Sequence, residues 1–177
     1  MRANEKMDGV SFMEMVRGFQ PACVVIAGAE LDVFSILRGK PMSARRLAGR
    51  IGGDLRATEV LLDALAAIGL LKKGSGREPV YRVRPAAAAL LSEKGAKSQM
   101  GMVRHLGNCL RRWGELAAVV RSGRPASRRP SVRGAEGDLE SFIRAMDEVS
   151  RPMAEPLVRS LGRLAFRHLL DIGGASG

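Results

Sequence analysis

The chain has 177 residues and is 46% hydrophobic, which is enough for a buried core and excludes a polypeptide that is disordered throughout. Its 29 Lys and Arg side chains exceed its 18 Asp and Glu side chains and give a net charge of +11, so an anionic partner must be considered. All of this excess lies within the first 137 residues. An arginine-rich surface in contact with water explains it more simply than a nucleic-acid site does.

The two cysteines, Cys23 and Cys109, lack the spacing of metal ligands. Because Cys23 lies in an apolar run, we expect buried, reduced thiols and no metal site. Residues 22–29 resemble the apolar part of a signal peptide, but acidic residues precede them where a signal peptide is basic. Glu30 and Asp32 leave that run too short to cross a membrane. These features predict a cytoplasmic protein without a membrane segment.

Residues 11–38 are predicted to form two or three helices that break near Pro21 and Gly28. One apolar stripe has the spacing of a helix face: Phe12, Met15, Val16 and Phe19. A second apolar set follows it: Val24, Val25, Ala27, Leu31, Phe34 and Leu37. Because exposed apolar helices would be a liability in a monomer, we expect a homodimer that forms through residues 11–38.

Two short helices joined by a tight turn are predicted next. Ser43 can cap the first helix, which ends at Gly52, and Asp54 can cap the second helix, which ends at Gly69. Residues 70–83 then have the pattern of two short strands around a glycine-containing turn. Helix, turn, helix and hairpin together predict a winged helix.

Winged helices often bind DNA, and this chain is basic, so the alternative function is that of a DNA-binding transcriptional regulator. The outward positions of its second helix are Arg56, Glu59, Asp63, Ala66 and Ala67. Two carboxylates at these positions would repel the phosphate backbone of DNA. The hairpin, by contrast, is basic at Lys72, Lys73, Arg77, Arg82 and Arg84. We therefore rank DNA binding second and expect no nucleic-acid partner.

A short helix is predicted over residues 85–91, and a long amphipathic helix over residues 99–121. The apolar stripe of the long helix contains Val103, Leu106, Leu110, Trp113, Ala117 and Val120. We interpret Trp113 on this stripe as an anchor in the core. We interpret His105, beside the stripe, as a residue of the surface or the core edge and not as a catalytic residue.

Residues 123–137 combine arginine, proline and glycine with few apolar residues, which predicts an exposed basic linker. Asp138 can cap a helix that Pro152 interrupts, and Pro156 suits the first turn of a further helix. Residues 169–177, with the sequence LLDIGGASG, then predict a short strand that leads into a glycine-rich turn. Such a turn is typical of the first strand-to-helix connection in a nucleotide-binding α/β sheet.

The order of these segments resembles the small-molecule O-methyltransferases of the hydroxyindole and caffeate type, which use S-adenosylmethionine. The resemblance rests on stretches that occur in one order: ALAAIGLL (64–71), WGEL (113–116), SGRP (122–125), FIRAM (142–146) and LDIGGASG (170–177). It implies a mainly α fold, in which a winged-helix dimerisation domain with additional helices precedes the first strand and glycine turn of a Rossmann-like α/β methyltransferase domain. The winged helix of that family does not bind DNA.

The resemblance also implies a division of the chain and roles for single residues. Residues 1–122 would be the dimerisation domain, 123–137 a basic linker loop, and 138–177 the linking helices with the start of the S-adenosylmethionine-binding domain. The residues that correspond to the first cofactor motif are Asp171, Gly173, Gly174 and Gly177. The residues on a helix that borders the substrate and cofactor pocket are Phe142 and Met146. From their spacing alone, these two would be core residues of an amphipathic helix.

The chain departs from the family pattern at two places. Ala175 stands where relatives commonly have a third glycine, and the acid that usually binds the ribose lies about 20 residues beyond the glycine turn. No residue matches the family's general base, because His105 and His168 do not occupy that position, so we assign no catalytic residue. We therefore expect a truncated or split methyltransferase that is inactive alone, or a catalytically inactive partner of a longer relative.

Overall fold

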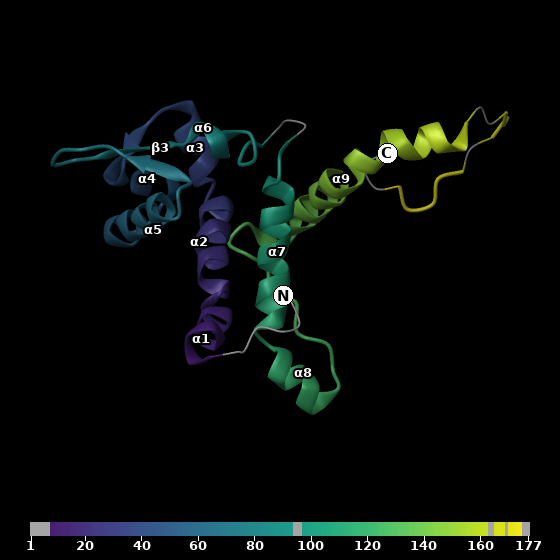
Figure 1. Ribbon diagram of the computed structural model, residues 1–177, viewed down its shortest axis with the longest axis horizontal. Helices are drawn as coiled ribbons and strands as arrows, with labels where there is room; N and C mark the ends of the chain where they lie inside the picture. Colours follow the sequence, from purple (N-terminus) through teal and green to yellow (C-terminus); the bar gives the residue numbers. More distant parts are fainter. Residues whose placement is uncertain (1–7, 94–96, 163–164, 169, 175–177) are drawn as a thin grey trace.

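The computed structural model describes residues 8–93, 97–162, 165–168 and 170–174. Its elements form a small winged-helix body, a pair of roughly side-by-side helices next to it, and a long helix that leads away from both (Figure 1). The mainly helical fold class that the sequence predicts is confirmed, since the described residues contain a single small sheet of three short strands.

Three helices open the described chain: α1 (Gly9–Arg17), α2 (Phe19–Glu30) and α3 (Val33–Gly39). The breaks fall at Gly18 and at residues 31–32, so the predicted breaks near Pro21 and Gly28 are wrong. Pro21 is tolerated because it lies in the first turn of α2, where a backbone N–H has no helical partner. Gly28 is buried, and an added Cβ would lie 3.0 Å from the ring of Phe34. Close packing therefore explains this glycine.

The winged helix forms as the sequence predicts. Its elements are β1 (Met42–Ser43), α4 (Ala44–Ile51), α5 (Leu55–Ala67), β2 (Leu71–Lys73), β3 (Val80–Val83) and α6 (Pro85–Ala88). Asp54 accepts a hydrogen bond from the backbone N–H of Ala57 at 2.8 Å and so caps α5. Gly52 and Gly69 have φ of +65° and +86°, which glycine adopts without steric cost. Local turn chemistry therefore determines the start of α5 and the ends of both helices, whereas Ser43, predicted to cap α4, makes no side-chain capping hydrogen bond.

The sheet is antiparallel, with strand order β1-β3-β2 and with Met42 and Lys73 both opposite Tyr81. The core between this sheet and helices α2 to α5 contains large, fully buried side chains: Phe34, Leu37, Leu47, Leu62, Leu65, Leu71 and Tyr81. The Tyr81 hydroxyl donates to Asp63 at 2.7 Å, and Lys73 donates to the same carboxylate at 2.9 Å. Asp63 thus holds the wing against α5, and Lys73 of the wing is already paired within the chain.

Helix α7 (Met100–Trp113) and helix α8 (Leu116–Ser122) replace the single long helix predicted over 99–121. The break lies at Gly114, and Trp113 is 68% exposed. The prediction of Trp113 as a core anchor is therefore wrong for the single chain. The buried face of α7 consists instead of Met100, Gly101, Arg104 and Gly107. Met100 is the single large apolar side chain among these four residues, so hydrophobic periodicity does not detect this face as a buried stripe.

Small residues let α7 approach both of its neighbours, α2 and α9 (Gly134–Leu161). A Cβ added at Gly101 would lie 2.6 Å from the Cβ of Arg144 on α9, and one added at Gly107 would lie 2.6 Å from Ile26 on α2. The Glu148 carboxylate on α9 accepts hydrogen bonds from the backbone N–H groups of residues 101 and 102 at 3.0 and 2.8 Å. A side chain of α9 therefore caps the first turn of α7.

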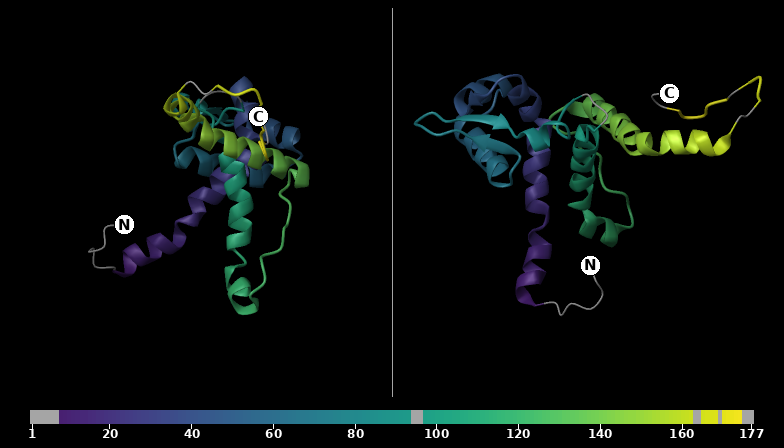
Figure 2. Two further views of the ribbon diagram at one scale, coloured as in Figure 1. Left: turned by 90° about the vertical axis from the view of Figure 1, so that its right-hand side faces the viewer. Right: turned by 45° about the horizontal axis from the view of Figure 1, so that its top comes forward.

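Helix α9 is continuous over 28 residues, so the predicted interruption at Pro152 is wrong, and so is the predicted cap at Asp138. Asp138 lies inside the helix and accepts from the hydroxyl and N–H of Ser131 at 2.5 and 2.9 Å. Pro152 and Pro156 occupy interior positions, where each lacks the backbone donor of a regular turn. The helix beyond Pro152 extends away from the rest of the molecule and is exposed throughout residues 149–161 (Figures 1 and 2).

The predicted strand over 169–172 is absent from its described residues, 170–172. These residues are exposed and are not paired with the three-stranded sheet. A parallel strand needs neighbouring strands to satisfy its backbone groups, and the part of the chain that the structure describes offers none there. Residues 169 and 175–177 lie outside the described residues.

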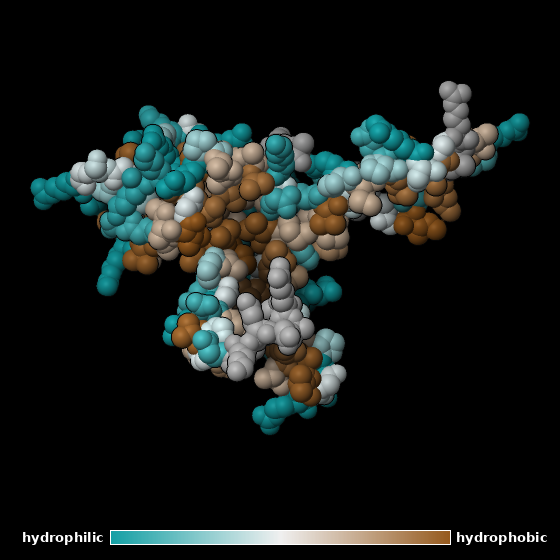
Figure 3. Space-filling model, viewed as in Figure 1, coloured by the Kyte–Doolittle hydropathy of each residue, from teal (hydrophilic) through white to brown (hydrophobic). Residues whose placement is uncertain are grey.

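Large exposed apolar side chains gather on two helical regions. On α1 and the start of α2 they are Val10, Phe12, Met13, Met15, Val16 and Phe19, and on α9 they are Leu139, Phe142, Met146, Val149, Met153, Leu157, Val158 and Leu161. In Figure 3 hydrophilic side chains cover the upper side of the outer part of α9, and apolar surface lies along its lower side. Cys23 is exposed as well, so the predicted burial of its thiol is wrong for the single chain.

Helices α1 and α2 together form one stretch, Gly9–Glu30, that is long and apolar enough to cross a membrane by length and composition. The prediction that the apolar run around residues 22–29 is too short to cross a membrane is therefore wrong by this criterion of length and composition. One such stretch near an N-terminus is weak evidence for a membrane segment, because core helices of other proteins meet the same criterion. The exposed apolar side chains of this stretch fit a protein partner equally well.

Candidate substrate cavity

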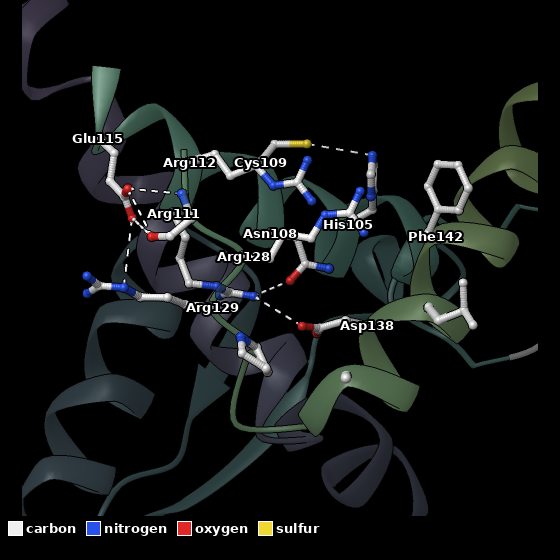
Figure 4. Close-up of a pocket in the computed structure, with 14 residues that line it drawn as sticks. His105, Asn108, Cys109, Arg111, Arg112, Glu115, Arg128, Arg129, Asp138 and Phe142 are labelled. Carbon is white, nitrogen blue, oxygen red and sulfur yellow. Dashed lines mark hydrogen bonds and ion pairs between the residues drawn. The ribbon is translucent and has the colours of Figure 1, made fainter. Parts of the chain in front are cut away.

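A cavity of about 440 Å³ lies between α7, the loop 123–133 and the first turns of α9 (Figure 4). Below it is called the α7–α9 cavity. Its lining residues are His105, Asn108, Cys109, Arg111, Arg112, Glu115, Ser127, Arg128, Arg129, Pro130, Ala135, Asp138, Leu139 and Phe142. A volume of this size is within the range of small-molecule sites.

His105, Cys109 and Phe142 form one wall of this cavity. The imidazole of His105 lies 5.2 Å, centroid to centroid, from the Phe142 ring. The thiol of Cys109, one helical turn along α7, lies 3.6 Å from His105 Nε2. The four-residue spacing of His105 and Cys109 was a signal in the sequence that could have found this pair. The structure therefore places His105 on the cavity wall, where the sequence predicted a residue of the surface or core edge.

The structure separates the two residues that the resemblance assigned to the substrate pocket. Phe142 lines the cavity and is 43% exposed. Met146, one turn further along α9, is 37% exposed and is not part of the cavity lining. Neither is a buried core residue in the single chain. Their contact with a substrate remains a prediction.

Arg111 connects the cavity to the N-terminal helices. Its guanidinium donates to Glu30 on α2 at 2.8 Å and to Asn108, and it lies 3.9 Å from Asp138 on α9. A chain of polar contacts thus runs from α2 through α7 to α9. This arrangement fixes one arginine of the cavity in place and links its position to that of α2.

The arginine-rich loop 123–133 is fastened to helices on both sides. Glu115 accepts from the Ser127 hydroxyl at 2.9 Å and lies 3.8 Å from Arg129. Hydrogen bonds from Ser127 and the charge of Arg129 hold the pKa of Glu115 below its ordinary value. At the other end of the loop, Ser131 donates to Asp138. The segment predicted as an exposed linker is therefore also a wall of the cavity.

Helix α7 also carries a buried arginine, Arg104, that nothing in the sequence analysis found. Arg104 is 4% exposed and donates to the backbone oxygen of Ala29 at 3.0 Å, to Glu93 at 2.6 and 3.0 Å, and to Asp32 at 2.6 Å. Arg133 of the loop also donates to Asp32, at 3.0 Å. This polar cluster connects α2, α7 and the loop.

Two features show how strongly this cluster constrains its members. Burial raises the pKa of Glu93, but hydrogen bonds from Arg104 and Ser35 and the charge of Arg144 outweigh it, so the pKa is below its ordinary value. Asp32 has φ of +55°, and no other described non-glycine residue has a positive φ. Such a conformation persists where the surrounding contacts hold it, and here two arginines do so.

The predicted cofactor residues do not form a site with the rest of the described chain. Asp171, Gly173 and Gly174 are exposed and lie outside the α7–α9 cavity, and Gly177 lies outside the described residues. Gly173 has φ of +80°, as a tight turn allows. The contribution of these four residues to a cofactor site therefore remains a prediction. No group of three metal-ligating side chains occurs among the described residues either.

The geometry defines a winged-helix domain that packs on a helical layer with a small-molecule cavity. Residues 13–93 match the family model described as the O-methyltransferase dimerisation domain. Acetylserotonin O-methyltransferase of Mus musculus is 30% identical over 189 aligned positions, which cover 99% of this chain and 49% of that protein. The tetracenomycin polyketide synthesis 8-O-methyl transferase TcmO of Streptomyces glaucescens is also 30% identical, over 93% of this chain and 50% of its own length.

Solved structures agree with these relatives. Human N-acetylserotonin methyltransferase in complex with SAM is 27% identical and superposes with a TM-score of 0.66 over 85% of this chain and 48% of its own. PigF with SAH is 25% identical, with a TM-score of 0.65 over 86% of this chain and 48% of its own. Residues 13–93 are thus an O-methyltransferase dimerisation domain, homologous to that of S-adenosylmethionine-dependent O-methyltransferases. The chain spans about half the length of these relatives, and they give no support to DNA binding.

Proposed function

We propose that the chain is the dimerisation and substrate-lid portion of an S-adenosylmethionine-dependent O-methyltransferase that methylates a hydroxyl of a small molecule. The observation that carries this proposal is the α7–α9 cavity directly beside a domain of the matching family. In this proposal the cavity side chains orient the acceptor and exclude water, while the cofactor supplies the methyl group. Orientation of two bound reactants contributes much of the acceleration in such a transfer.

The proposed division of labour follows the chain. Residues 1–122 associate with a second copy, residues 123–137 close one side of the cavity, and residues 138–177 lead into the cofactor domain. Phe142 and Met146 border the acceptor, and Asp171, Gly173, Gly174 and Gly177 contribute to the cofactor site once further α/β units complete it. We place the protein in the cytoplasm, as a homodimer without a nucleic-acid partner.

Sedimentation of the 177-residue chain tests the homodimer. Phe19 is 53% exposed on α2, within the proposed interface at residues 11–38. Phe19→Asp places a charge there, and we expect it to shift micromolar protein from dimer to monomer. Val60→Asp is the matched control, because it also replaces an exposed apolar side chain by a carboxylate. Val60 is 63% exposed on α5, outside that interface. A monomeric parent chain would contradict the proposal.

Calorimetric titration with S-adenosylmethionine tests the cofactor assignment. We expect no heat of binding from the 177-residue chain and saturable heat from a form extended through its downstream coding sequence. In the extended form, Gly173→Val should abolish binding, because valine disfavours a φ of +80°. Gly162→Val is the control, since its φ is also positive, at +65°, but it lies outside the proposed motif. Equal losses in the two variants would contradict a specific role for Gly173.

A further inference from the structure

The α7–α9 cavity brings a thiol, an imidazole and several guanidinium groups together. We propose that Cys109 is a site of reversible S-thiolation, at which a small disulfide that carries carboxylates, such as glutathione disulfide, forms a mixed disulfide with the thiol. Arg112 and Arg128 bind the carboxylates, and His105 accepts the proton of the thiol. Such a modification does not depend on methyl transfer.

The two thiols of the chain lie in different surroundings. Cys109 lines the cavity of about 440 Å³ and is partly exposed, and its Sγ lies 3.6 Å from His105 Nε2 (Figure 4). Cys23 is exposed on α2. An adjacent imidazole activates a cysteine by taking its proton. The residues three and four positions from Cys23 on its helix are uncharged: Phe19, Gln20, Ile26 and Ala27.

The lining of the cavity favours a reagent with negative charge. Its four arginines outnumber its two carboxylates, Glu115 and Asp138. Both carboxylates already accept hydrogen bonds from serines of the loop 123–133. Positive charge in a concave site raises the local concentration of anions, because the protein walls have a low dielectric constant. An anionic disulfide should therefore reach this cavity more often than a neutral one.

Arg112 and Arg128 are the cavity arginines available to an outside ligand. Both are exposed, and neither has a carboxylate partner among the residues that the structure describes. Arg112 lies three positions after Cys109 on α7, so the two side chains are neighbours on one side of the helix. Arg128 comes from the loop 123–133. Because a guanidinium matches both oxygens of a carboxylate, these arginines can hold the reagent beside Cys109.

The proposed step is a thiol–disulfide exchange. The proton of the Cys109 thiol passes to His105 Nε2, and the sulfur then attacks one sulfur of the small disulfide. The S–S bond of the reagent breaks, and a new S–S bond joins Cys109 to one half of it. The other half leaves as a thiolate and takes up a proton. Cys109 is thereby oxidised and the leaving half reduced, so the disulfide itself is the oxidant.

Reaction rates with an anionic and a neutral disulfide test the proposal on chains that keep one thiol each. Cys23→Ser leaves Cys109, and Cys109→Ser leaves Cys23. The reagents are the dianion dithiobisnitrobenzoate and the neutral dithiodipyridine. We expect the ratio of the two rate constants, anionic over neutral, to be at least about tenfold higher for Cys109 than for Cys23, because cationic concave sites accelerate association of anions by about that factor or more. Equal ratios would overturn the inference.

Two double variants of the Cys23→Ser chain separate local charge from overall charge. Arg112→Gln/Arg128→Gln should slow the reaction of Cys109 with the dianion at least about fivefold and leave the reaction with the neutral disulfide unchanged. Arg50→Gln/Arg121→Gln removes the same charge from exposed positions outside the cavity lining, so we expect a much smaller effect. Equal losses in the two double variants would overturn the assignment of the carboxylate site.

His105→Gln in the same chain tests the proton acceptor. Loss of the imidazole should slow the reaction of Cys109 with both reagents, because the proton transfer is common to both. The ratio of the two rate constants should stay the same, unlike in the arginine variant. Unchanged rates would overturn the part assigned to His105.

Treatment of the parent chain with glutathione disulfide identifies the product. We expect mass spectrometry of peptic fragments to find the glutathionyl group on Cys109 at higher occupancy than on Cys23, and dithiothreitol to remove it. Modification of Cys23 alone, or a bond that dithiothreitol does not break, would overturn the inference. None of these measurements uses S-adenosylmethionine, so their failure would leave the proposed function intact.

Discussion

The winged-helix body and the long helix α9 differ in how far they bury their large apolar side chains. The body buries its large side chains completely, with Phe34, Leu62 and Tyr81 at 0% exposure. Helix α9, with 28 residues, is twice as long as α7, the next longest helix in the described chain with 14, yet it buries only Ser141 and Ala145. The comparison shows that one region is stabilised by its own core, whereas the other presents apolar side chains that further protein surface would cover.

Hydrogen exchange should reveal the largest contrast between the two regions. We expect backbone amides in the middle of α5 to exchange at least about a thousandfold more slowly than those of residues 153–161 in α9, since local opening of an exposed helix costs little free energy. The prolines at positions 152 and 156 weaken that part further, because they remove two backbone donors. Mass spectrometry of peptic fragments measures both segments in one sample. Equal protection would show that the end of α9 is covered in solution.

Removal of the buried guanidinium should have the largest effect among single substitutions. Arg104→Met leaves Glu93 and Asp32 without their buried partner, and we expect the free energy of unfolding to fall by about 3–5 kcal/mol. Urea denaturation followed by circular dichroism measures this loss. Arg45→Met is the control, because Arg45 and its partner Glu78 are each 72% exposed, so we expect a change within about 0.5 kcal/mol. A similar small loss for Arg104→Met would show that the cluster does not stabilise the chain.

A single methyl group between α7 and α9 should have an intermediate effect. Gly101→Ala puts a Cβ 2.6 Å from Arg144 Cβ and 2.8 Å from the backbone nitrogen of residue 145. We expect the helices to move apart and stability to fall by about 1–3 kcal/mol. Gly49→Ala adds the same methyl group to α4, where nothing lies within 4 Å, and should stabilise the chain by about 0.5–1 kcal/mol. Denaturant midpoints of the two variants should therefore move in opposite directions.

The smallest expected effect is the contribution of Glu93 to the pH dependence of stability. The pKa of Glu93 is lower in the folded chain than its ordinary value of 4.5. Its ionised form therefore stabilises the fold above pH 4.5, and this contribution is lost as the pH falls through the folded pKa. Glu93→Gln should lower the free energy of unfolding by about 1 kcal/mol at pH 7. At pH 3 the difference in this free energy between the variant and the parent chain should be smaller. A constant difference between pH 7 and pH 3 would exclude Glu93 as the titrating group.

The winged helix could be predicted from the sequence because its signals are local. Asp54 caps a helix through a residue three positions away, and Gly52 and Gly69 end helices through their own backbone conformation. The apolar spacing of Leu61, Leu65 and Ile68 needs no knowledge of distant segments. The order of motifs along the chain then led to the dimerisation domain, which the comparisons confirmed.

The helical layer could not be predicted in the same way, because its determinants are distant in sequence. Arg104 is buried only because Asp32 and Glu93 reach it, from 72 and 11 residues away. Glycines at 101 and 107 replace the large apolar residues that a periodicity search requires. The cavity depends on a loop whose serines bind the carboxylates of Glu115, between α7 and α8, and Asp138 on α9. None of these partnerships leaves a periodic pattern, so only the contact of His105 with Cys109 was accessible from spacing.

The cap that Glu148 provides to α7 has a consequence for the order in which the chain can fold during synthesis. Gln99 at the start of α7 makes no capping hydrogen bond with its own side chain. The N–H of Met100 donates to the nearby Ser98 hydroxyl, but the next two N–H groups, of residues 101 and 102, donate to a carboxylate 47 and 46 residues downstream. The ribosome must therefore release residue 148 before α7 can receive this cap. By then the winged helix has left the exit tunnel and can already pair with a second nascent chain, before either copy has formed its cavity.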